Sequence, residues 1–582
     1  ILGFLRQGAD GGNIMNMFMI SVSLAVAAIP EGLPAVVTIV LALGMKRMVS
    51  RNAIVKRLLA VETLGSVSVI CSDKTGTLTQ NEMTVRFVWS GGRMFKVTGT
   101  GYEPEGEFTD LQDKPVDVSR FRSLAMTLTG GALCNDAELV YGSDGVSITG
   151  DPTEGAIITA AAKAGLSKND LNDIFPRFTE LPFDSERKMM TTFHKGSLYP
   201  ISYTKGAPDI VISRCAHIDL DGQILPFTDE LRQRAIELNS MMASQALRVL
   251  AVAYREHKQV PSDSSSYAIE NDMILLGLIA MSDPPRPEAA EAVKKCRTAG
   301  IRPVMITGDH KDTAIAVAEE LDLMRGGDGV LTGADVSRLS DEELRRAVKT
   351  TAVYARVSPE DKVRIVSALK ANGEITAMTG DGVNDAMALK HADIGVSMGI
   401  TGTDVAKSTA DMVLTDDNFA SIVSAVEEGR IIYANIRKFV SFLLSCNIGE
   451  ILIVFFAILF NLPIPLTAIQ LLWLNLVTDS FPALALGNER AERDIMRSPP
   501  RSKNSQIIDL RMAISICFQA VVLAATVLCG YVFARNNGAQ RGLTGDALVS
   551  YSQTIAFALL ICCELLRSFS CRSERTPLLR MG

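Results

Sequence analysis

The sequence predicts a multi-domain protein: a bundle of membrane helices joined to an α/β domain with a doubly wound parallel sheet, into which an α+β domain is inserted. Long apolar segments occur near both ends of the 582-residue chain, and they are long enough to cross a hydrocarbon core of about 30 Å. Between them, short apolar runs are followed by acidic turns and helical patterns, which is typical of a parallel sheet. Residues 85–281, which mix short strands with helices, separate the first of these runs from the others.

The composition fits a mixture of membrane spans and soluble domains. Hydrophobic residues make up 47% of the chain although 21% of its residues are charged, so the chain combines apolar and polar segments. The net charge of −7 disfavours a nucleic-acid-binding protein. The ten cysteines form no C-x-x-C pattern, so reduced thiols are expected. Because the chain begins with Ile in an apolar run, we expect it to be a fragment.

The first apolar run, residues 67–71, leads into C-S-D-K-T-G-T-L-T at residues 71–79. We interpret the run as a buried strand that ends in a tight turn. Asp73 then stands at the carboxyl end of a strand, where open α/β sheets bind their ligands. A carboxylate there can attack a phosphoryl group and carry it covalently. Lys74 adds a fixed positive charge beside it, and Thr75 adds a hydroxyl group.

Later segments repeat the pattern of an apolar run followed by a polar turn. The residues that we expect at the same edge of the sheet as Asp73 are Thr307, Gly308, Asp309, Lys362, Asp381, Asn384 and Asp385. In this arrangement Lys362 would neutralise the oxygens of a phosphoryl group, and Thr307 would donate a hydrogen bond to them. Asp381 would join Asp73 and Thr75 at a Mg²⁺ ion, which prefers hard oxygen ligands and phosphate.

D-K-T-G-T-L-T, residues 73–79, resembles the phosphorylation motif of the P-type ATPases, pumps that pass through an aspartyl phosphate. The set of acidic turns also resembles the haloacid-dehalogenase superfamily, to which these pumps belong. The resemblance implies that Asp73 is phosphorylated from ATP with Mg²⁺ as cofactor.

A membrane-tethered haloacid-dehalogenase phosphatase is an alternative function. Superfamily phosphatases carry a second Asp two positions after the nucleophile as general acid and base, and this chain has Thr75 there. Without that carboxylate the aspartyl phosphate should hydrolyse slowly, which is what coupling to transport requires. The position of Thr75 therefore favours the pump.

Four stretches of the inserted segment, residues 150–156, 183–188, 203–209 and 247–253, together supply a polar turn that opens a helix, an aromatic ring, lysines and an arginine. A ring that stacks on a base, with lysine and arginine near the phosphates, suits a nucleotide pocket. The stretches resemble the nucleotide-binding domain of the same family, and by that resemblance Phe183 would stack on adenine. The other candidate nucleotide-binding residues are Thr153, Glu154, Lys188, Lys205, Arg248 and, outside the insert, Arg356.

The first membrane segment, residues 13–48, is interrupted by A-A-I-P-E-G-L-P. Two prolines and a glycine cannot hold an unbroken helix, and a membrane tolerates freed carbonyls only where they line a cavity or meet other protein. Glu31 lies at this break, and an intramembrane carboxylate costs roughly 3 kcal/mol on insertion scales. We therefore predict a cation site made by Glu31 and nearby carbonyls, those of Ala28 and Ile29.

An amphipathic stalk at residues 422–438 is expected to lead into four further spans, residues 439–460, 466–486, 512–532 and 550–569. Polar residues interrupt these spans at helical spacing. Hydrogen bonds between helices would explain the Asn and Thr residues, but they do not explain three more carboxylates at membrane depth. The candidate cation ligands in these spans are Asn447, Glu450, Asn475, Thr478, Asp479 and Glu564.

Oxygen donors of this kind suit Ca²⁺, which takes roughly six to eight oxygen ligands, whereas pumps for soft metals need thiolates. V-A-A-I-P-E-G-L-P, N-I-G-E and N-L-V-T-D resemble calcium pumps of the sarco/endoplasmic-reticulum type, including bacterial members. By that resemblance one site comprises Glu31, Asn475 and Asp479. The second comprises Asn447, Glu450, Thr478, Asp479 and Glu564. A pump for sodium or manganese is the alternative within the family.

The expected domains are the end of one membrane helix with the broken helix (1–48), the phosphorylation domain (49–84 and 282–421), the nucleotide-binding domain (85–281), the stalk (422–438) and four membrane helices (439–582). Basic residues after the first span place the phosphorylation site in the cytosol. We expect a monomeric multi-pass protein of the plasma membrane with ATP and calcium ions as partners. No T-G-E sequence occurs, so the family's actuator domain should precede residue 1, and the chain alone should not complete a transport cycle.

Overall fold

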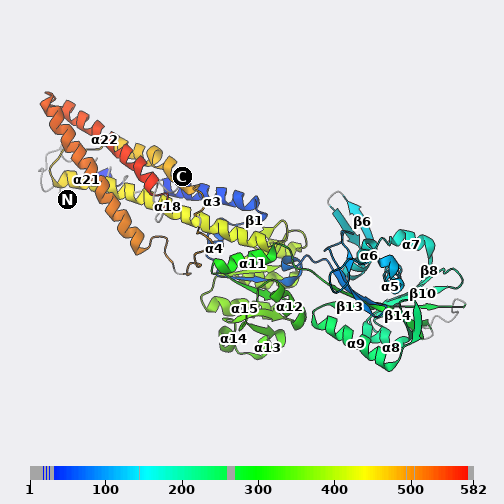
Figure 1. The fold of residues 1–582 in the computed structure, drawn as a ribbon. Coiled ribbons are helices and arrows are strands. Elements are labelled where there is room, and N and C mark those ends of the chain that lie inside the picture. Colours follow the sequence, from blue (N-terminus) through cyan, green and yellow to red (C-terminus); the bar gives the residue numbers. More distant parts are fainter. Residues whose placement is uncertain are drawn as a thin grey trace. The chain divides into compact units, whose positions relative to one another are not determined.

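The computed structural model describes residues 18, 21–22, 25, 32–142, 145–258, 269–492, 494–503 and 505–573. The chain divides into two compact units. One comprises Ile1–Cys71, Lys294–Pro303 and Val363–Gly582, and the other comprises Ser72–Val293 and Val304–Lys362. Both units contain α/β structure, and the first also contains the long apolar helices (Figure 1).

An eight-stranded sheet has the strand order β1-β20-β19-β18-β2-β15-β17-β16, and the boundary between the units passes through β2 and β15. The strands are β1 (Ala53–Val55), β20 (Met412–Leu414), β19 (Ile394–Met398), β18 (Thr376–Gly380), β2 (Val69–Ser72), β15 (Arg302–Ile306), β17 (Thr351–Ala355) and β16 (Gly329–Thr332). β18 pairs in parallel with β2 and β19, and β17 pairs in parallel with β15 and β16. Only the short edge strand β1 pairs antiparallel among the pairs described. The predicted parallel sheet is confirmed.

Helices connect these strands, as the crossover of a parallel sheet requires. They are α4 (Leu58–Leu64), α11 (Ala289–Thr298), α12 (Lys311–Glu320), α13 (Gly333–Arg338), α14 (Asp341–Ala347), α15 (Pro359–Ala371), α16 (Ala386–His391) and α17 (Asp404–Thr409). Every residue of β2, β17, β18 and β19 is buried. Such strands consist mostly of apolar and small residues because both faces of a parallel sheet are covered.

The inserted domain is built on a second, ten-stranded sheet with the main order β5-β4-β3-β14-β13-β10-β9-β8, to which β11 and β12 are attached. Its strands are β3 (Thr84–Ser90), β4 (Arg93–Val97), β5 (Phe108–Thr109), β8 (Arg177–Asp184), β9 (Met189–His194), β10 (Ile201–Gly206), β11 (Cys215–Leu220), β12 (Gln223–Pro226), β13 (Arg248–Glu256) and β14 (Met273–Ser282). A separate hairpin pairs β6 (Glu138–Gly142) with β7 (Gly145–Thr149).

Helices cover both faces of this second sheet. They are α5 (Arg122–Leu133), α6 (Pro152–Lys163), α7 (Lys168–Ile174), α8 (Pro208–Arg214) and α9 (Asp229–Ser244). Neighbouring residues of β14 enter different cores: Ile279 packs with α5 and α6, whereas Leu278 packs with α8 and α9. This alternation results from the period of two along a strand, and it explains why β14 is almost wholly apolar.

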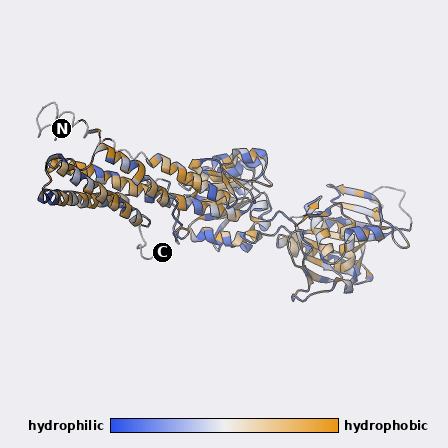
Figure 2. Ribbon diagram, turned by 90° about the horizontal axis from the view of Figure 1, so that it is seen from above, coloured by the Kyte–Doolittle hydropathy of each residue, from blue (hydrophilic) through white to orange (hydrophobic). Residues whose placement is uncertain are grey.

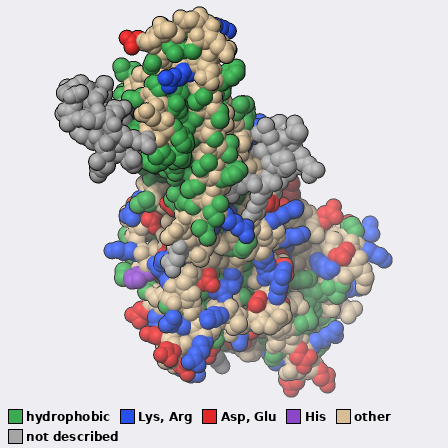
Figure 3. Space-filling model, turned by 90° about the vertical axis from the view of Figure 1, so that its left-hand side faces the viewer, with side chains coloured by type: hydrophobic (Ala, Val, Ile, Leu, Met, Phe, Trp, Pro, Cys, Tyr) green, Lys and Arg blue, Asp and Glu red, His purple; other side chains and the backbone are tan. Residues whose placement is uncertain are grey.

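Five helical segments of the described chain are long and apolar enough to cross a membrane. They are α3 (Gly32–Val49), α18 (Phe419–Leu459), the run α19 (Ala468–Trp473), η4 (Leu474–Thr478) and α20 (Ser480–Gly487), then α21 (Leu510–Gln540) and α22 (Gly545–Ser570). Their ribbons are mostly hydrophobic (Figure 2), and hydrophobic side chains cover their surface where charges cover the soluble domains (Figure 3). The protein is therefore a membrane protein.

The expected stalk and the next span are parts of a single helix. Residues 422–438 and 439–459 belong to one continuous helix of 41 residues, α18. No proline interrupts it, and Gly429 lies against the backbone of Gly65 just after α4, where a Cβ on either glycine would clash with the other residue's backbone. Residues 422–438, which carry most of the charged side chains, and the apolar residues 439–459 therefore belong to one continuous helix.

Candidate functional site

The phosphorylation loop comes directly after β2. Asp73 has extended backbone angles, and the next residues form a tight turn, η1 (Lys74–Leu78). Gly76 has a φ of 74°, a conformation that favours glycine. Lys362, on α15, places its Nζ 2.7 Å from Oδ2 of Asp73. The ammonium is largely buried, so its charge acts on the carboxylate with little screening by water.

A second ion pair joins two of the predicted catalytic segments. Lys74 forms a salt bridge with Asp309, which lies just beyond β15. Thr307 is two residues before Asp309, and its Oγ1 accepts a hydrogen bond from the backbone N–H of Asp309 at 3.2 Å. Gly308 is exposed, and no atom lies within 4 Å of where its Cβ would be. The structure thus brings Asp73, Lys74, Thr307, Asp309 and Lys362 into one connected loop region.

Asp283 supports the same loop, and the sequence analysis did not include it among the site residues. Its Oδ2 accepts a hydrogen bond of 2.5 Å from the Thr79 hydroxyl, and its Oδ1 accepts one of 3.3 Å from the Glu82 N–H. Burial raises the pKa of Asp283, while these hydrogen bonds oppose that shift. Arg286 adds a hydrogen bond of 3.0 Å to the carbonyl of Gly76. The D-P-P-R-P sequence at residues 283–287 contains both Asp283 and Arg286, and it is the sequence feature that could have identified them.

The acidic turn after β18 lies in the other unit. The carbonyl of Asp381 accepts hydrogen bonds from the N–H and the hydroxyl of Thr403. Asp385 is buried and accepts a hydrogen bond of 3.2 Å from the Gly382 N–H, whereas Asn384 is exposed. These contacts fix the shape of the turn. That Asp381 joins Asp73 and Thr75 at Mg²⁺ stays a prediction.

Phe183, Lys205 and Arg248, three of the candidate nucleotide-binding residues, lie at one end of the second sheet. Lys205 on β10 is opposite Met190 of β9, and Asp184, next to Phe183 on β8, is opposite Met189. Arg248 begins β13 at the same end, since Ala251 is opposite Gly206. The Phe183 side chain is 64% exposed, which leaves its ring open to a planar partner.

Glu154, a further candidate, contacts Lys205 at this end. Glu154, in the first turn of α6, accepts a charge-assisted bond of 2.6 Å from Lys205 Nζ, and its other oxygen accepts one of 3.0 Å from the Asp136 N–H. Thr153 is buried beside it. Lys188 and Arg356 both have a positive φ; Lys188 is exposed, and the Arg356 N–H donates to the carbonyl of Asp309 rather than joining the second sheet.

Buried carboxylates gather among the apolar helices. Glu450 of α18, Asp479 after η4 and Glu564 of α22, here called the carboxylate cluster, are each 0% exposed. None of their side-chain oxygens has a hydrogen-bond partner among the described residues, and the same holds for the amide of Asn447. Unpaired buried charges cost several kcal/mol each, so this set requires a cationic ligand or protons.

The remaining predicted cation ligands differ in how the structure places them. Asn475 is buried, and its carbonyl accepts a hydrogen bond from Ser480. Thr478 is only half-buried. The helical spacing of Asn475, Thr478 and Asp479 predicts one shared face, and the structure buries Asn475 and Asp479 but not Thr478, because η4 is a π-helical turn that departs from the α-helical register. Ala28, Ile29 and Glu31 lie outside the described residues.

Three known family models match parts of the chain. Residues 123–288 match the family model "P-type ATPase, cytoplasmic domain N", residues 215–393 match "haloacid dehalogenase-like hydrolase", and residues 463–582 match "Cation transporting ATPase, C-terminus". The "Calcium-transporting ATPase" of Bacillus subtilis strain 168 is 48% identical over 568 residues, which are 97% of this chain. The chain belongs to the P-type ATPases.

Other relatives of this P-type ATPase chain carry related names. "Calcium-transporting ATPase lmo0841" of Listeria monocytogenes is 43% identical over 96% of the chain and 60% of its own length. "Probable cation-transporting ATPase F" of Mycobacterium tuberculosis strain H37Rv is 43% identical over 100% of the chain and 63% of its own length. The chain likewise spans 63% of the Bacillus subtilis protein.

Proposed function

We propose that this P-type ATPase chain is the phosphorylated, nucleotide-binding and cation-binding part of an ATP-driven calcium pump. The observation that carries the proposal is the set of three buried carboxylates without hydrogen-bond partners, Glu450, Asp479 and Glu564, in membrane helices. The same chain holds Asp73 against Lys362. A soluble phosphatase does not need buried carboxylates in membrane helices, and a cation channel does not need a carboxylate nucleophile paired with a lysine.

The chemical step is the transfer of the γ-phosphoryl group of ATP to Asp73. A carboxylate oxygen attacks the γ-phosphorus, the bond to the bridging oxygen breaks, and ADP leaves with the electron pair. Lys362 stabilises the negative charge that spreads over the phosphoryl oxygens. Thr307, Gly308 and Asp309 shape the pocket at the end of β15.

The proposed nucleotide site binds adenine on Phe183 and orients the phosphates with cations, chiefly Lys205, Lys188 and Arg248. Mg²⁺ would neutralise phosphate charge when bound, and the oxygens of Asp73 and Thr75 are hard donors of the kind that it prefers. Both residues are half-buried, whereas Lys74 and residues 76–79 of the same loop are buried, so these two remain accessible to an ion. Glu154 holds Lys205 in position through the bond of 2.6 Å.

The transported ion that we propose is Ca²⁺. Carboxylate and amide oxygens from α18, the η4 segment and α22 match its preference for several hard oxygen ligands. The names of the Bacillus subtilis and Listeria relatives support calcium over sodium or manganese. We further propose that the catalytic domains are cytosolic, that the membrane is the plasma membrane and that the pump is monomeric.

Phosphorylation of the purified chain tests the proposal. With radiolabelled [γ-³²P]ATP, Mg²⁺ and Ca²⁺, the chain should form an acid-stable, hydroxylamine-labile phosphoenzyme that Asp73→Asn lacks. An acyl phosphate is labile to hydroxylamine, whereas phosphoserine and phosphothreonine are not. Absence of this species in the folded chain would refute the function. Its formation at an unchanged rate with Na⁺ or Mn²⁺ replacing Ca²⁺ would refute the choice of ion.

A further inference from the structure

Cys446 lies beside two members of the carboxylate cluster. Its Sγ and one carboxylate oxygen each from Asp479 and Glu564 all lie within 4.8 Å of one another. The three side chains come from three different helical segments, α18, the residue after η4 and α22. Cys446 is 1% exposed, and the two carboxylates are 0% exposed. The sequence analysis did not include this thiol among the candidate ligands.

A buried cysteine alone is usually a small apolar residue of the core. Here the carboxylate oxygens of Asp479 and Glu564 have no hydrogen-bond partners among the described residues. A sulfur placed beside two such carboxylates is a mixed donor set, and apolar packing does not account for it. All ten cysteines of the chain are free thiols, so Cys446 is not held in a disulfide.

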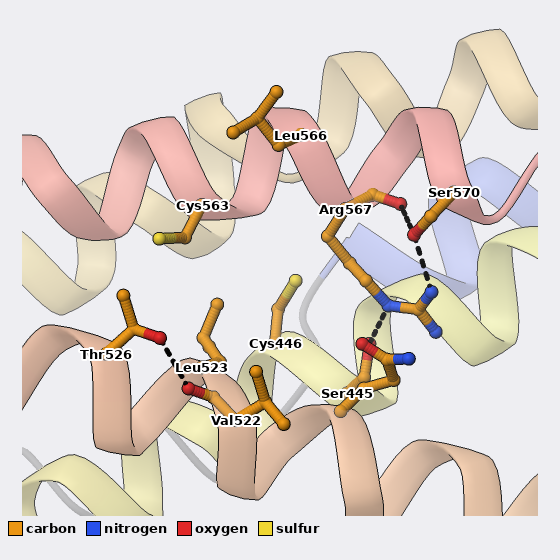
Figure 4. A pocket seen from close by; sticks show the side chains of 10 residues that line it. Ser445, Cys446, Val522, Leu523, Thr526, Cys563, Leu566, Arg567 and Ser570 are labelled. Atoms are coloured by element: carbon orange, nitrogen blue, oxygen red, sulfur yellow. Dashed lines mark hydrogen bonds between the residues drawn. The ribbon is translucent and has the colours of Figure 1, made fainter. Parts of the chain in front are cut away.

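Cys446 also lines a cavity between the membrane helices. A cavity of about 260 Å³ is lined by Cys446 of α18 together with residues of α21 and α22, including Cys563 and Arg567 (Figure 4). The Arg567 guanidinium donates to the hydroxyls of Ser445 and Ser570, at 3.3 and 2.8 Å. This positive charge disfavours a cation in that cavity, so a cation bound by Cys446 belongs on the side of Asp479 and Glu564.

The separations are within reach of a single ion. Zinc binds cysteine sulfur at about 2.3 Å and carboxylate oxygen at about 2.0–2.2 Å in a tetrahedral arrangement, so two ligand atoms on one zinc ion are roughly 3.4–3.6 Å apart. The three donors, which lie within 4.8 Å of one another, must approach by up to about 1 Å to bind it, a distance that side-chain rotation can supply. Calcium prefers oxygen, whereas thiolate ligands favour softer metals. The thiol therefore changes the ion selectivity that carboxylates alone would give.

We propose that the carboxylate cluster also accepts a thiophilic divalent cation, of the class of Zn²⁺ and Cd²⁺, with Cys446 Sγ, Asp479 and Glu564 as ligands. The thiol loses its proton when the metal binds. The proposal rests on the proposed function, since it assigns a second ion to the same cluster. Cys446 is then a specificity-determining residue of the cation site.

Cadmium titration of the purified full chain in detergent tests the proposal, because a cadmium–thiolate bond gives an ultraviolet charge-transfer band. We expect Cys446→Ser to lose a high-affinity part of this band and to weaken Cd²⁺ binding by at least about 10- to 100-fold, the range seen for loss of supporting residues at metal sites. Cys563→Ser is the matched control, since this thiol lines the neighbouring cavity but is outside the three-ligand set. It should keep the band.

Competition and a second variant complete the test. Excess Ca²⁺ should suppress the Cys446-dependent band, and Glu564→Gln should weaken Cd²⁺ binding even if Cys446→Ser fails to fold. An identical high-affinity band in wild type and in folded Cys446→Ser would overturn the proposal. So would a Glu564→Gln chain with wild-type affinity for Cd²⁺.

Binding of ⁴⁵Ca²⁺ to the same preparations separates the two proposals. If Ca²⁺ binds but the cadmium band does not depend on Cys446, the thiophilic site is refuted and the calcium pump stands. If the Cys446-dependent band is present and Ca²⁺ does not bind, the metal site is supported and the calcium assignment is refuted.

Discussion

Lysine ammonium groups organise the phosphorylation loop. Lys362 forms a salt bridge with the nucleophile Asp73, whereas Lys74 forms a salt bridge with Asp309. Both ammonium groups are buried, with residue exposures of 7% and 5%. A buried cation beside the nucleophile lowers the repulsion between the carboxylate and an incoming phosphate. The two lysines therefore have different roles, although both are near the loop.

We expect Lys362→Met to slow formation of the phosphoenzyme by about 100-fold or more. The substitution keeps the length of the side chain but removes the charge that stabilises the phosphoryl oxygens, and loss of one such group costs on the order of 10²- to 10³-fold. Rapid-quench measurement of phosphorylation by ATP reports this rate. Lys362→Arg, which keeps the charge, should be less impaired, and equal loss in both variants would contradict the electrostatic role.

A second prediction at this scale concerns His257 in the inserted domain. Burial, with the nearby Arg255 charge, lowers the pKa of His257 from 6.5 to about 4. Its Nε2 lies 2.8 Å from the Ser202 hydroxyl. Between about pH 4 and pH 6.5 the unfolded chain binds more protons at this residue than the folded chain does. The contribution of neutral His257 to stability is therefore present above pH 6.5 and is lost as the pH falls towards 4.

Histidine hydrogen–deuterium exchange followed by mass spectrometry measures this pKa in the full chain. The exchange rate at the imidazole C2 position of His257 should show its inflection near pH 4 in the folded chain. In urea the inflection should return to about 6.5 because burial is lost. A folded-state inflection that stays near 6.5 would contradict the buried environment of the ring.

At the scale of the element, the π-helical turn η4 determines where the carboxylate of Asp479 lies. The Asp479 N–H donates to the carbonyl of Leu474, five residues earlier, at 2.9 Å. The wider turn accommodates one extra residue compared with an α-helix, and such turns are frequent at functional sites. Asn475 and Asp479 are thereby both buried, while Leu476 between them is 48% exposed.

Insertion of one alanine after Leu476 should abolish calcium binding. The π turn already holds one extra residue, so a further residue rotates Asp479 and α20 by about 100° relative to α19, and Asp479 leaves the carboxylate cluster although the span stays apolar. Leu476→Ala keeps the register and is the matched control, because that side chain is exposed. Equilibrium binding of ⁴⁵Ca²⁺ to the purified chains measures the effect. Normal binding by the insertion variant would show that the register of Asp479 is not needed.

At the scale of the whole molecule, the sequence predicted the architecture well because its signals are local. Continuous apolar runs such as β2 and long apolar helices such as α18 are direct consequences of burial on both faces and of span length. The N-cap Asp151, which accepts a hydrogen bond from the Thr153 N–H, likewise begins α6 where its turn signal lies. Each of these features can be predicted from residues that are adjacent in the sequence.

Features that depend on distant residues could not be predicted in the same way. The pairing of Lys74 with Asp309 and of Thr79 with Asp283 joins residues far apart in the chain. The π turn has no reliable sequence signal, so the helical spacing of Thr478 was misleading. Cys446 is likewise an ordinary apolar residue of a span until α22 brings Glu564 beside it.

The last prediction concerns coupling between the carboxylate cluster and the nucleophile. In the proposed pump, phosphorylation of Asp73 by ATP requires bound Ca²⁺, whereas phosphorylation by inorganic phosphate does not. Glu450→Gln keeps the shape of a fully buried side chain but removes its charge, so the Ca²⁺ concentration for half-maximal phosphorylation by ATP should rise by at least about tenfold. Phosphorylation by inorganic phosphate should persist. Asp546→Asn, an exposed carboxylate at the start of α22, is the control and should behave as wild type. If Glu450→Gln leaves the calcium dependence unchanged, Glu450 is not a ligand; if both reactions disappear together, the variant has lost the phosphorylation site rather than its coupling to calcium.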